Sequence, residues 1–423
     1  MPSTTPESLI LRKAREILGQ AEDLVRYLEG AGFQEPNFTK SSPPHPANRE
    51  YDTIRIKLTE AAEDLIFLAK GPMQWIRTYC VLHHDFAAWQ IALRFKLFTI
   101  VPLEGTISVS DMAAVAKMDG DRLGRIMKLL ATQRCFREVD EDVFEHTSLS
   151  AFIARNKDIE SSMALQADEM FEAVSMSATA IESAPYTSDI SHTAFTMRFG
   201  SPPYQWYTAN SKRSARFASA MAGLVQMNQD TTEIRDNFPW ANLSNKTIVD
   251  VGGGSGHTSI YLATQFPDLK FIVQDINPTM LSEGPKRREF ESVGERISFM
   301  QYDFLQPQQI HNAGIFLLRQ IIHNYNDEMC IKILGSLVPA LEKCPPETSV
   351  LINDVVLPEA NTVPKVYEHH LRQLDIIMLN VFAGKERTLK EFAHLLDQTD
   401  ERLKIIQVHG QGVMQLVEIK LVR

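Results

Sequence analysis

Residues 247–257 read Thr-Ile-Val-Asp-Val-Gly-Gly-Gly-Ser-Gly-His, and this stretch decides the fold. The apolar, mostly β-branched run at 248–251 predicts a short strand buried in a parallel sheet. The glycines that follow predict a tight turn whose backbone N–H groups can approach a ligand closely. The turn begins with Gly252, Gly253 and Gly254. A helical pattern comes next, so the segment has the strand–loop–helix layout of a nucleotide-type cofactor site.

A second predicted strand, 271–275, ends in an acid. Asp275 lies about 20 residues past the glycines, where a carboxylate can bind both hydroxyls of a ribose. The G-x-G-x-G spacing differs from the dinucleotide fingerprint, and no Gly-Lys-Ser/Thr of a phosphate-binding loop follows. A nucleoside without phosphates fits these features, so S-adenosyl-L-methionine is the expected cofactor. The alternative is a strand–helix turn whose glycines only ease packing.

Composition limits the classes of protein and partner. The 423 residues are 44% hydrophobic and 23% charged, which is ordinary for a soluble globular protein of two or three domains. The net charge of −10 argues against a nucleic-acid or anionic-membrane partner. No secretory signal and no apolar run of about 20 residues is present, so a cytoplasmic location is expected. The four cysteines are far apart in the sequence, which predicts neither disulfides nor a metal site.

The first part of the chain reads as helical. Apolar periodicity predicts helices over 8–31, 53–67 and 73–95, and the third is rich in aromatic residues that need a partner surface. Residues 98–146 carry two short helices and two extended pieces, the pattern of a small winged helix-turn-helix. Such units often bind DNA, but the acidic turn at 140–142 and the negative net charge oppose that function. Dimerisation is the favoured role.

These patterns divide the chain into three predicted segments. Residues 1–150 are expected to form a helical and winged-helix dimerisation domain. Residues 151–240 read as a helical segment with many aromatic residues and methionines, and we expect it to contribute the substrate pocket. Residues 241–423 alternate strands and helices, which predicts an α/β domain with a Rossmann-like, doubly wound sheet.

The candidate ligand-binding and catalytic side chains are predicted at one edge of this sheet, because ligands bind at the carboxyl ends of parallel strands. The strands of this sheet are predicted near 247–251, 271–275, 297–300, 314–319 and 349–354, with a late hairpin at 403–409 and 414–421.

Three residues near that edge could carry acid–base chemistry. His323 follows the fourth strand, and an imidazole with an ordinary pKa near 6.5 suits a general base. Asp354 comes just after the next strand and could orient the ring. Glu386, on a glycine-containing loop, could do the same from the other side. The alternative is a purely structural role, in which His323 only makes hydrogen bonds at the start of a helix.

Six motifs together resemble the plant caffeic-acid-type and fungal aflatoxin-type S-adenosylmethionine-dependent O-methyltransferases. The motifs are Val-Asp-Val-Gly-Gly-Gly-Ser-Gly-His at 249–257, Phe-Pro-Asp-Leu at 266–269 with Val-Gln-Asp at 273–275, Tyr-Asp-Phe at 302–304, Leu-Leu-Arg-Gln-Ile-Ile-His-Asn-Tyr-Asn-Asp at 317–327, Asn-Asp-Val-Val-Leu-Pro at 353–358 and Gly-Lys-Glu-Arg-Thr at 384–388. The N-terminal part resembles the dimerisation domain of that family, so the likeness covers nearly the whole chain and implies a homodimer.

The resemblance implies a role for each matching residue. The glycine loop would hold the methionine end of the cofactor, and Asp275 its ribose. Asp303 and Phe304 would frame the adenine, with Arg319 as a basic contact to the cofactor. His323 stands at the position of the catalytic base, flanked by Asp354 and Glu386.

The chain also departs from the family pattern. The common His-Asp-Trp is His323-Asn324-Tyr325 here, and Tyr325 can still cover an adenine ring. Ile377 and Val381 stand where the plant enzymes carry residues that touch the phenol, so the substrate must differ. The high Phe and Met content fits a bulky, apolar secondary metabolite, either a polyketide or an alkaloid.

Three functions remain open at this level. The first is O-methyl transfer to a small-molecule hydroxyl with His323 as general base. The second is a pericyclase or cyclase (dehydration, Diels–Alder or Alder-ene type), in which the cofactor acts only by its positive charge, as some fungal relatives do. The third is a non-catalytic regulatory dimer. The intact set of His323, Asp354 and Glu386 favours methyl transfer.

Overall fold

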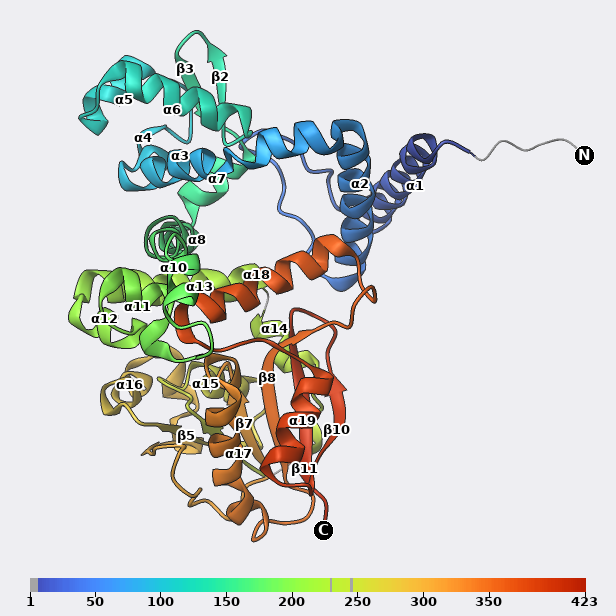
Figure 1. Cartoon of the computed structure of the whole chain (residues 1–423), viewed down its shortest axis with the longest axis vertical. Coiled ribbons are helices and arrows are strands. Elements are labelled where there is room, and N and C mark those ends of the chain that lie inside the picture. Colours follow the sequence, from blue (N-terminus) through green and yellow to red (C-terminus); the bar gives the residue numbers. More distant parts are fainter. Residues whose placement is uncertain (1–6, 229, 244–245) are drawn as a thin grey trace, which may run out of the picture. The chain divides into compact units, whose positions relative to one another are not determined.

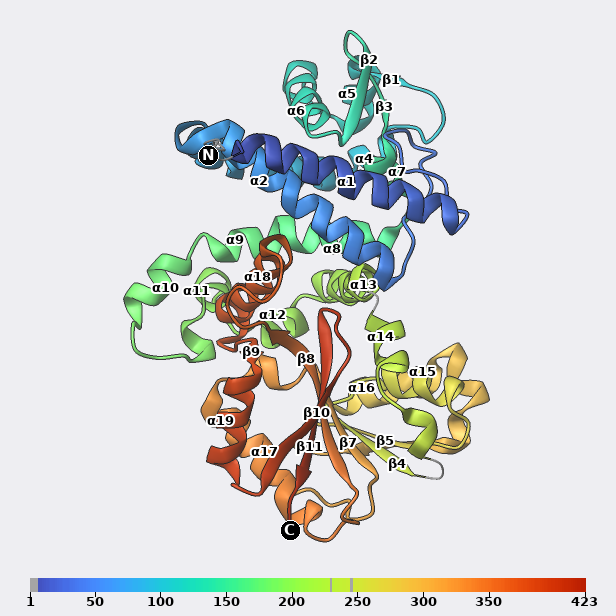
Figure 2. The same cartoon turned by 90° about the vertical axis from the view of Figure 1, so that its right-hand side faces the viewer.

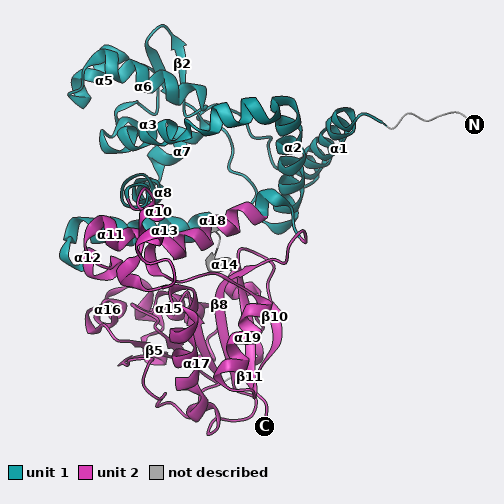
Figure 3. Ribbon diagram, viewed as in Figure 1, with its two compact units in different colours: residues 1–172, 207–227, 363–367 teal, residues 173–206, 228–362, 368–423 magenta. Residues whose placement is uncertain are grey.

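The computed structural model describes residues 7–228, 230–243 and 246–423 (Figure 1). The chain forms two compact units, coloured separately in Figure 3. Unit 1 contains residues 1–172, 207–227 and 363–367, and unit 2 contains 173–206, 228–362 and 368–423. Both units are discontinuous in sequence, whereas the predicted segments 1–150, 151–240 and 241–423 are continuous. That division of the sequence stays a prediction.

Unit 1 begins with helices, one of which differs from the prediction. Its first four helices are α1 (Leu9–Gly30), α2 (Arg49–Tyr79), α3 (Leu82–Arg94) and α4 (Leu97–Ile100). The helix expected over 73–95 is wrong as a single element, because the chain leaves the helical conformation between Tyr79 and Leu82. The gap expected between 67 and 73 corresponds to a kink inside α2 at Gly71, whose φ of 63° is not helical, followed by Pro72.

The second half of unit 1 is a small α/β arrangement. Three short strands pair antiparallel in the order β1-β3-β2 beside α5 and α6. Ser108 and Asp119 cap these two helices by accepting hydrogen bonds from backbone N–H groups. The elements are β1 (Ile107–Ser108), α5 (Val109–Ala116), α6 (Gly120–Thr132), β2 (Phe136–Asp140), β3 (Val143–His146), α7 (Ser148–Arg155), α8 (Lys157–Leu165), a π-helix (Gln166–Met170) and α13 (Ser211–Asn228).

Unit 2 is built on a sheet with the order β10-β11-β8-β7-β4-β5-β6. The five neighbouring strands β8, β7, β4, β5 and β6 are parallel to one another. Strand β11 runs antiparallel to both β8 and β10. The doubly wound sheet of the prediction is confirmed. Its strands are β4 (Thr247–Val251), β5 (Lys270–Asp275), β6 (Ile297–Gln301), β7 (Ile315–Arg319), β8 (Ser349–Leu357), β10 (Leu403–His409) and β11 (Met414–Leu421), and the short β9 (Arg387–Thr388) pairs with the end of β8.

Alternate residues of each central strand face opposite layers of helices. In β4, Val249 and Val251 belong to the apolar core shared with α17 (Asp327–Leu341) and α19 (Leu389–Thr399), whereas Ile248 packs with α15 (His257–Gln265). Figure 2 shows these helices on the two sides of the sheet. Because both faces are covered, the central strands β4, β7 and β8 are almost wholly buried and mostly apolar.

The remaining helices of the chain connect these layers. They are α9 (Phe171–Val174), α10 (Ser177–Ser183), α11 (Ala194–Phe199), α12 (Pro203–Ala209), α14 (Asp230–Asp236), α16 (Pro278–Glu283) and α18 (Lys365–Phe382), with 3₁₀ turns at Ile190–His192, Trp240–Leu243, Gly284–Lys286, Arg288–Ser292, Gly294–Arg296 and Ile322–Asn324. Among the described helices, none combines the length and apolar character that crossing a membrane requires.

Candidate active site

The glycine loop between β4 and α15 has the conformation that its sequence predicts. Gly252, Gly254 and Gly256 have φ values of 75°, 58° and 73°, a region that side chains other than glycine's rarely adopt. A Cβ at Gly253 would lie 2.5 Å from the Asp250 carboxyl carbon, so a side chain there cannot be accommodated without a shift. The loop is therefore a bare backbone cradle, as a closely bound ligand requires.

Asp275, the last residue of β5, lies against this loop. Its Oδ2 accepts a hydrogen bond of 3.0 Å from Gly254 N–H, and its Oδ1 accepts one of 2.8 Å from Asn277 N–H. Each carboxylate oxygen has two lone pairs and keeps one for a further donor. The carboxylate is thus fixed beside the cradle with capacity for two hydroxyl groups, which fits a ribose.

Asp250 supports the loop from within the sheet. It is buried, and its Oδ2 accepts a hydrogen bond of 2.7 Å from the Ser259 hydroxyl at the start of α15. Burial raises the pKa of Asp250 to about 6, against the opposing effects of Ser259 and of the positive charge of Arg319. Arg319 ends β7 and donates from Nη1 to Asn353 Oδ1. This places its guanidinium at the same edge of the sheet as the glycine loop.

Two loops contribute an aromatic pair at this edge. Phe304 follows β6 and Tyr325 follows the 3₁₀ turn after β7, and their ring centroids are 5.8 Å apart in an edge-to-face arrangement. Asp303 precedes Phe304 and accepts a hydrogen bond of 2.9 Å from Leu305 N–H. The three side chains expected around an adenine therefore follow β6 and β7, and two of them are in ring contact across the strands between.

His323 and Glu386 form a hydrogen-bonded pair although 63 positions separate them in sequence. His323 lies in the 3₁₀ turn Ile322–Asn324, and its Nδ1 is 2.9 Å from Glu386 Oε1. The two side chains are 12% and 2% exposed, respectively. Because Glu386 engages Nδ1, Nε2 is the ring nitrogen that can take a proton from an acceptor molecule.

Asp354 contacts His323 in a different way from the one expected. It lies inside β8, which extends to Leu357, and not just after the strand. Its Oδ2 accepts a hydrogen bond of 3.1 Å from the backbone N–H of His323, so the contact holds the turn and not the imidazole ring.

The buried charges around His323 shift its pKa upward. Burial alone would lower the pKa of His323, but the Asp354 charge and the hydrogen bond to Glu386 outweigh it and raise that pKa to about 9. Burial and the nearby Glu386 raise the pKa of Asp354 to about 6. Within the described chain, Asp354 Oδ1 and Glu386 Oε2 are buried and meet no hydrogen-bond donor. Such acceptors indicate a place for a bound polar group.

Aromatic side chains of α11 and α12 are also part of unit 2. Tyr204 on α12 packs its ring on Phe382, with centroids 5.5 Å apart. Tyr204 is 55% exposed. The sequence does not mark this residue, since one tyrosine in an aromatic-rich helical segment carries no distinctive signal.

A hydrogen-bonded link joins the segment before these helices to the loops that carry His323 and Glu386. The Ser188 hydroxyl donates to the carbonyl of Ala383 (2.9 Å), and Asn326 Nδ2 donates to the carbonyl of Ser188 (2.9 Å). We call these two bonds the Ser188 link. Among the described residues, no group of three or more His, Cys, Asp or Glu side chains could hold a metal ion.

Comparison with known proteins places this site in a family. Residues 184–400 match the model of the O-methyltransferase domain. The chain is 40% identical to O-methyltransferase sol2 of Alternaria solani over 408 residues, which cover 96% of this chain and 94% of the relative. The chain belongs to this O-methyltransferase family. It is an S-adenosylmethionine-dependent methyltransferase, and the cradle, Asp275 and the aromatic pair fit that cofactor.

Solved structures share the fold. OxaC covers 97% of this chain and 98% of its own, with a TM-score of 0.76 and 23% identity. A protein described as a pericyclic reaction enzyme covers 88% and 94%, with a TM-score of 0.71 and 19% identity. At these identities the likeness shows the architecture alone.

Asp275→Ala should weaken S-adenosylmethionine binding by about 1–3 kcal/mol, because two ligand hydroxyls lose their acceptor and Gly254 N–H loses its own. Isothermal titration calorimetry measures the change. Asp268→Ala, an exposed carboxylate outside the site, is the matched control and should bind as the wild type does. Wild-type affinity in Asp275→Ala would remove Asp275 from the cofactor site.

Proposed function

We propose that this enzyme methylates a hydroxyl group of a bulky, apolar secondary metabolite, a polyketide or an alkaloid, with His323 as the general base. The observation that carries the proposal is the buried contact between His323 Nδ1 and Glu386 Oε1. It joins a base and its orienting carboxylate at the same sheet edge as the cofactor cradle, which is the geometry that proton removal next to a bound cofactor needs.

Each of the three residues has a distinct part in this proposal. S-adenosylmethionine, when bound, supplies an electrophilic methyl group on a positively charged sulfur. His323 Nε2 accepts the proton of the acceptor hydroxyl as that oxygen attacks. Glu386 fixes the tautomer and stabilises the resulting imidazolium, and Asp354 holds the turn through the His323 backbone N–H. The remaining rate enhancement comes from holding the two reactants in line.

The proposed class of substrate rests on the aromatic side chains of unit 2. Phe195, Phe199 and Trp206 pack together on α11 and α12, and Tyr204 packs on Phe382 in a tilted arrangement. Flat, apolar surfaces of this kind suit a polycyclic acceptor. OxaC has been solved with sinefungin and meleagrin and with SAH and oxaline, so an enzyme of the same fold takes molecules of that size.

A second candidate is a pericyclase that keeps the cofactor intact. The pericyclic reaction enzyme with the same fold is the observation in its favour. The 40% identity to an O-methyltransferase over 96% of the chain, together with the His323–Glu386 pair, favours methyl transfer.

His323→Ala should slow turnover about 10²–10⁴-fold, because proton removal loses its base. Cofactor affinity should change by less than about twofold, since the ring faces the acceptor. Steady-state kinetics with methyl-labelled cofactor, combined with calorimetry, provides both values. His311→Ala, a histidine outside the site, is the control and should retain wild-type turnover.

The same assay separates the two candidate functions. Methyl transfer releases one S-adenosylhomocysteine for each product molecule. Product that accumulates over many turnovers while the cofactor stays methylated would overturn the methyltransferase proposal in favour of the pericyclase.

The pH dependence of kcat/KM should reflect the raised pKa of His323. The charged groups that face this ring are Asp354, Glu386 and Arg387. Because the base acts only when neutral and its pKa is about 9, kcat/KM should rise with pH up to about 9 and then level off. Glu386→Gln removes the carboxylate that favours the imidazolium, so the midpoint should move to lower pH. An unchanged midpoint in Glu386→Gln would contradict the assignment.

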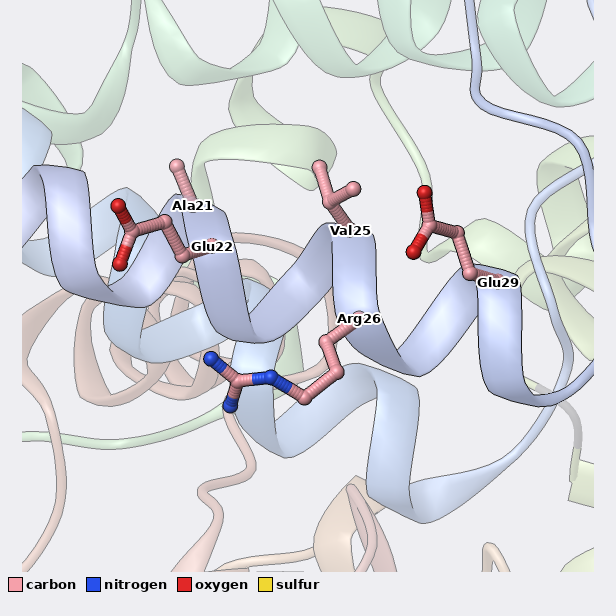
Figure 4. A pocket seen from close by; sticks show the side chains of 5 residues that line it. All are labelled: Ala21, Glu22, Val25, Arg26 and Glu29. Carbon is pink, nitrogen blue, oxygen red and sulfur yellow. The ribbon is translucent and has the colours of Figure 1, made fainter.

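We also propose that the enzyme is a homodimer, formed through the first helices of unit 1. Exposed large apolar side chains on α1 and α2 include Leu9, Ile10, Leu18, Phe67, Met73 and Ile76. A hollow on α1 is lined by five residues of that helix alone, Ala21, Glu22, Val25, Arg26 and Glu29 (Figure 4). An apolar surface of this extent needs a partner, and a second copy is the partner this family resemblance implies.

The wild-type protein should sediment as a dimer at micromolar concentration in analytical ultracentrifugation. The double substitution Met73→Glu and Ile76→Glu should yield monomers, because it places charges in the apolar surface of α2. Gln74→Glu, an exposed polar position between them, should leave the dimer intact. A monomeric wild type would refute the proposal.

A further inference from the structure

Arg387 is a fully buried cation that bonds to several backbone carbonyls. It is 1% exposed, and it donates to the Asp327 carboxylate from Nε (3.1 Å) and Nη2 (2.7 Å). Nη1 donates to the carbonyls of Ile322 and Lys385, both at 3.2 Å. Nη2 donates to the carbonyl of Tyr325 at 3.0 Å. All three guanidinium nitrogens are therefore in use, and the buried charge has a counter-ion.

These carbonyls belong to the two segments that carry the proposed base and its partner. Ile322 begins the turn in which His323 lies, Tyr325 directly follows that turn, and Lys385 directly precedes Glu386. One side chain thus joins both segments. The planar guanidinium presents its donors in a fixed arrangement, whereas a lysine ammonium at the same place cannot reach all of these acceptors at once.

The two segments approach each other at backbone distance. A Cβ at Gly384 would lie 2.0 Å from the His323 carbonyl oxygen and 2.7 Å from the Asn324 carbonyl carbon. No side chain fits between them, so a displacement of the Glu386 loop is passed directly to the His323 turn.

A second group fixes the Glu386 loop from the other side. Asp375 lies on α18 and is partly buried, and its Oδ1 accepts a hydrogen bond of 2.9 Å from the backbone N–H of Glu386. Arg387 and Asp375 therefore bracket Glu386, one through the carbonyl before it and the other through its own N–H.

We propose that Arg387 and Asp375 are positioning residues that set the distance and orientation of the His323–Glu386 pair. The inference rests on the proposed function of His323. Neither side chain needs to touch substrate or cofactor, because each acts through the backbone of the residues that do. An ångström of displacement at a reacting pair reduces turnover strongly, so the constraint bears on rate and not on ligand affinity.

The first test compares Arg387→Lys with Lys385→Met. Both wild-type side chains pair with Asp327, but the side chain of Arg387 also reaches the carbonyls. Arg387→Lys keeps the charge and should lower kcat about 10- to 100-fold, with the cofactor dissociation constant within about twofold of wild type. Because Glu386 is then less well held, the pH midpoint of kcat/KM should also fall. Lys385→Met should behave as the wild type.

A double-mutant cycle shows whether Arg387 acts through His323. In a His323→Ala background the base is already absent, so adding Arg387→Lys should cause no further loss of kcat. A loss of the same size in both backgrounds would overturn the inference, as would wild-type kcat and pH midpoint in Arg387→Lys.

Asp375 offers a second test that does not disturb the buried arginine. Asp375→Asn retains an oxygen that can accept from Glu386 N–H and should keep most of the wild-type kcat, whereas Asp375→Ala should lose about tenfold. Equal kcat in the two variants would overturn the role of Asp375. If Arg387→Lys fails to fold, the comparison of Asp375→Asn with Asp375→Ala decides the inference alone.

The two proposals fail in different ways. If His323→Ala retains full turnover, the proposed function of His323 is wrong. If His323→Ala is slow but Arg387→Lys and Asp375→Ala are as fast as wild type, only the positioning inference is wrong.

Discussion

The parallel register of β5, β4, β7 and β8 is the constraint on which the rest of the site depends. Hydrogen bonding between these strands sets their carboxyl ends side by side, so the loops that follow must meet at one edge. The glycine loop, Asp275, Arg319 and the His323 turn each begin where such a strand ends. No other property of the sequence brings them together, since they span more than 70 positions of the chain.

Burial at this edge gives the polar groups their chemical character. His323, Asp354 and Glu386 are removed from water together, and the two carboxylates help to raise the pKa of His323. Isolated charges would be unstable in such surroundings, but here the histidine, two carboxylates and Arg387 with Asp327 compensate one another. The site is therefore one electrostatic unit, and the proton affinity of the base is a property of the whole group.

The parts of the fold and of the candidate site that depend on neighbouring residues could be predicted from the sequence. The glycine loop and Asp275 belong to a strand–loop–helix–strand pattern within about 30 residues, and the alternation of strands and helices indicates the sheet. The ring contact between His323 and Glu386 was anticipated only as a possibility, because it joins distant loops. The break after Tyr79 and the true length of β8 had no marker, since apolar periodicity continues across both. Asp375 and the carbonyl bonds of Arg387 depend on backbone positions that exist only in the folded chain.

The Ser188 link attaches the segment before α11 to the loops of His323 and Glu386 without using any aromatic side chain. The hydroxyl of Ser188 and the amide of Asn326 bond to main-chain carbonyls, and none of the aromatic rings of α11 and α12 takes part. Those rings can change in size or number while the segment stays attached to the loops of His323 and Glu386. If these rings form the acceptor surface proposed above, that surface can diverge between related enzymes while the geometry of His323 and Glu386 stays the same.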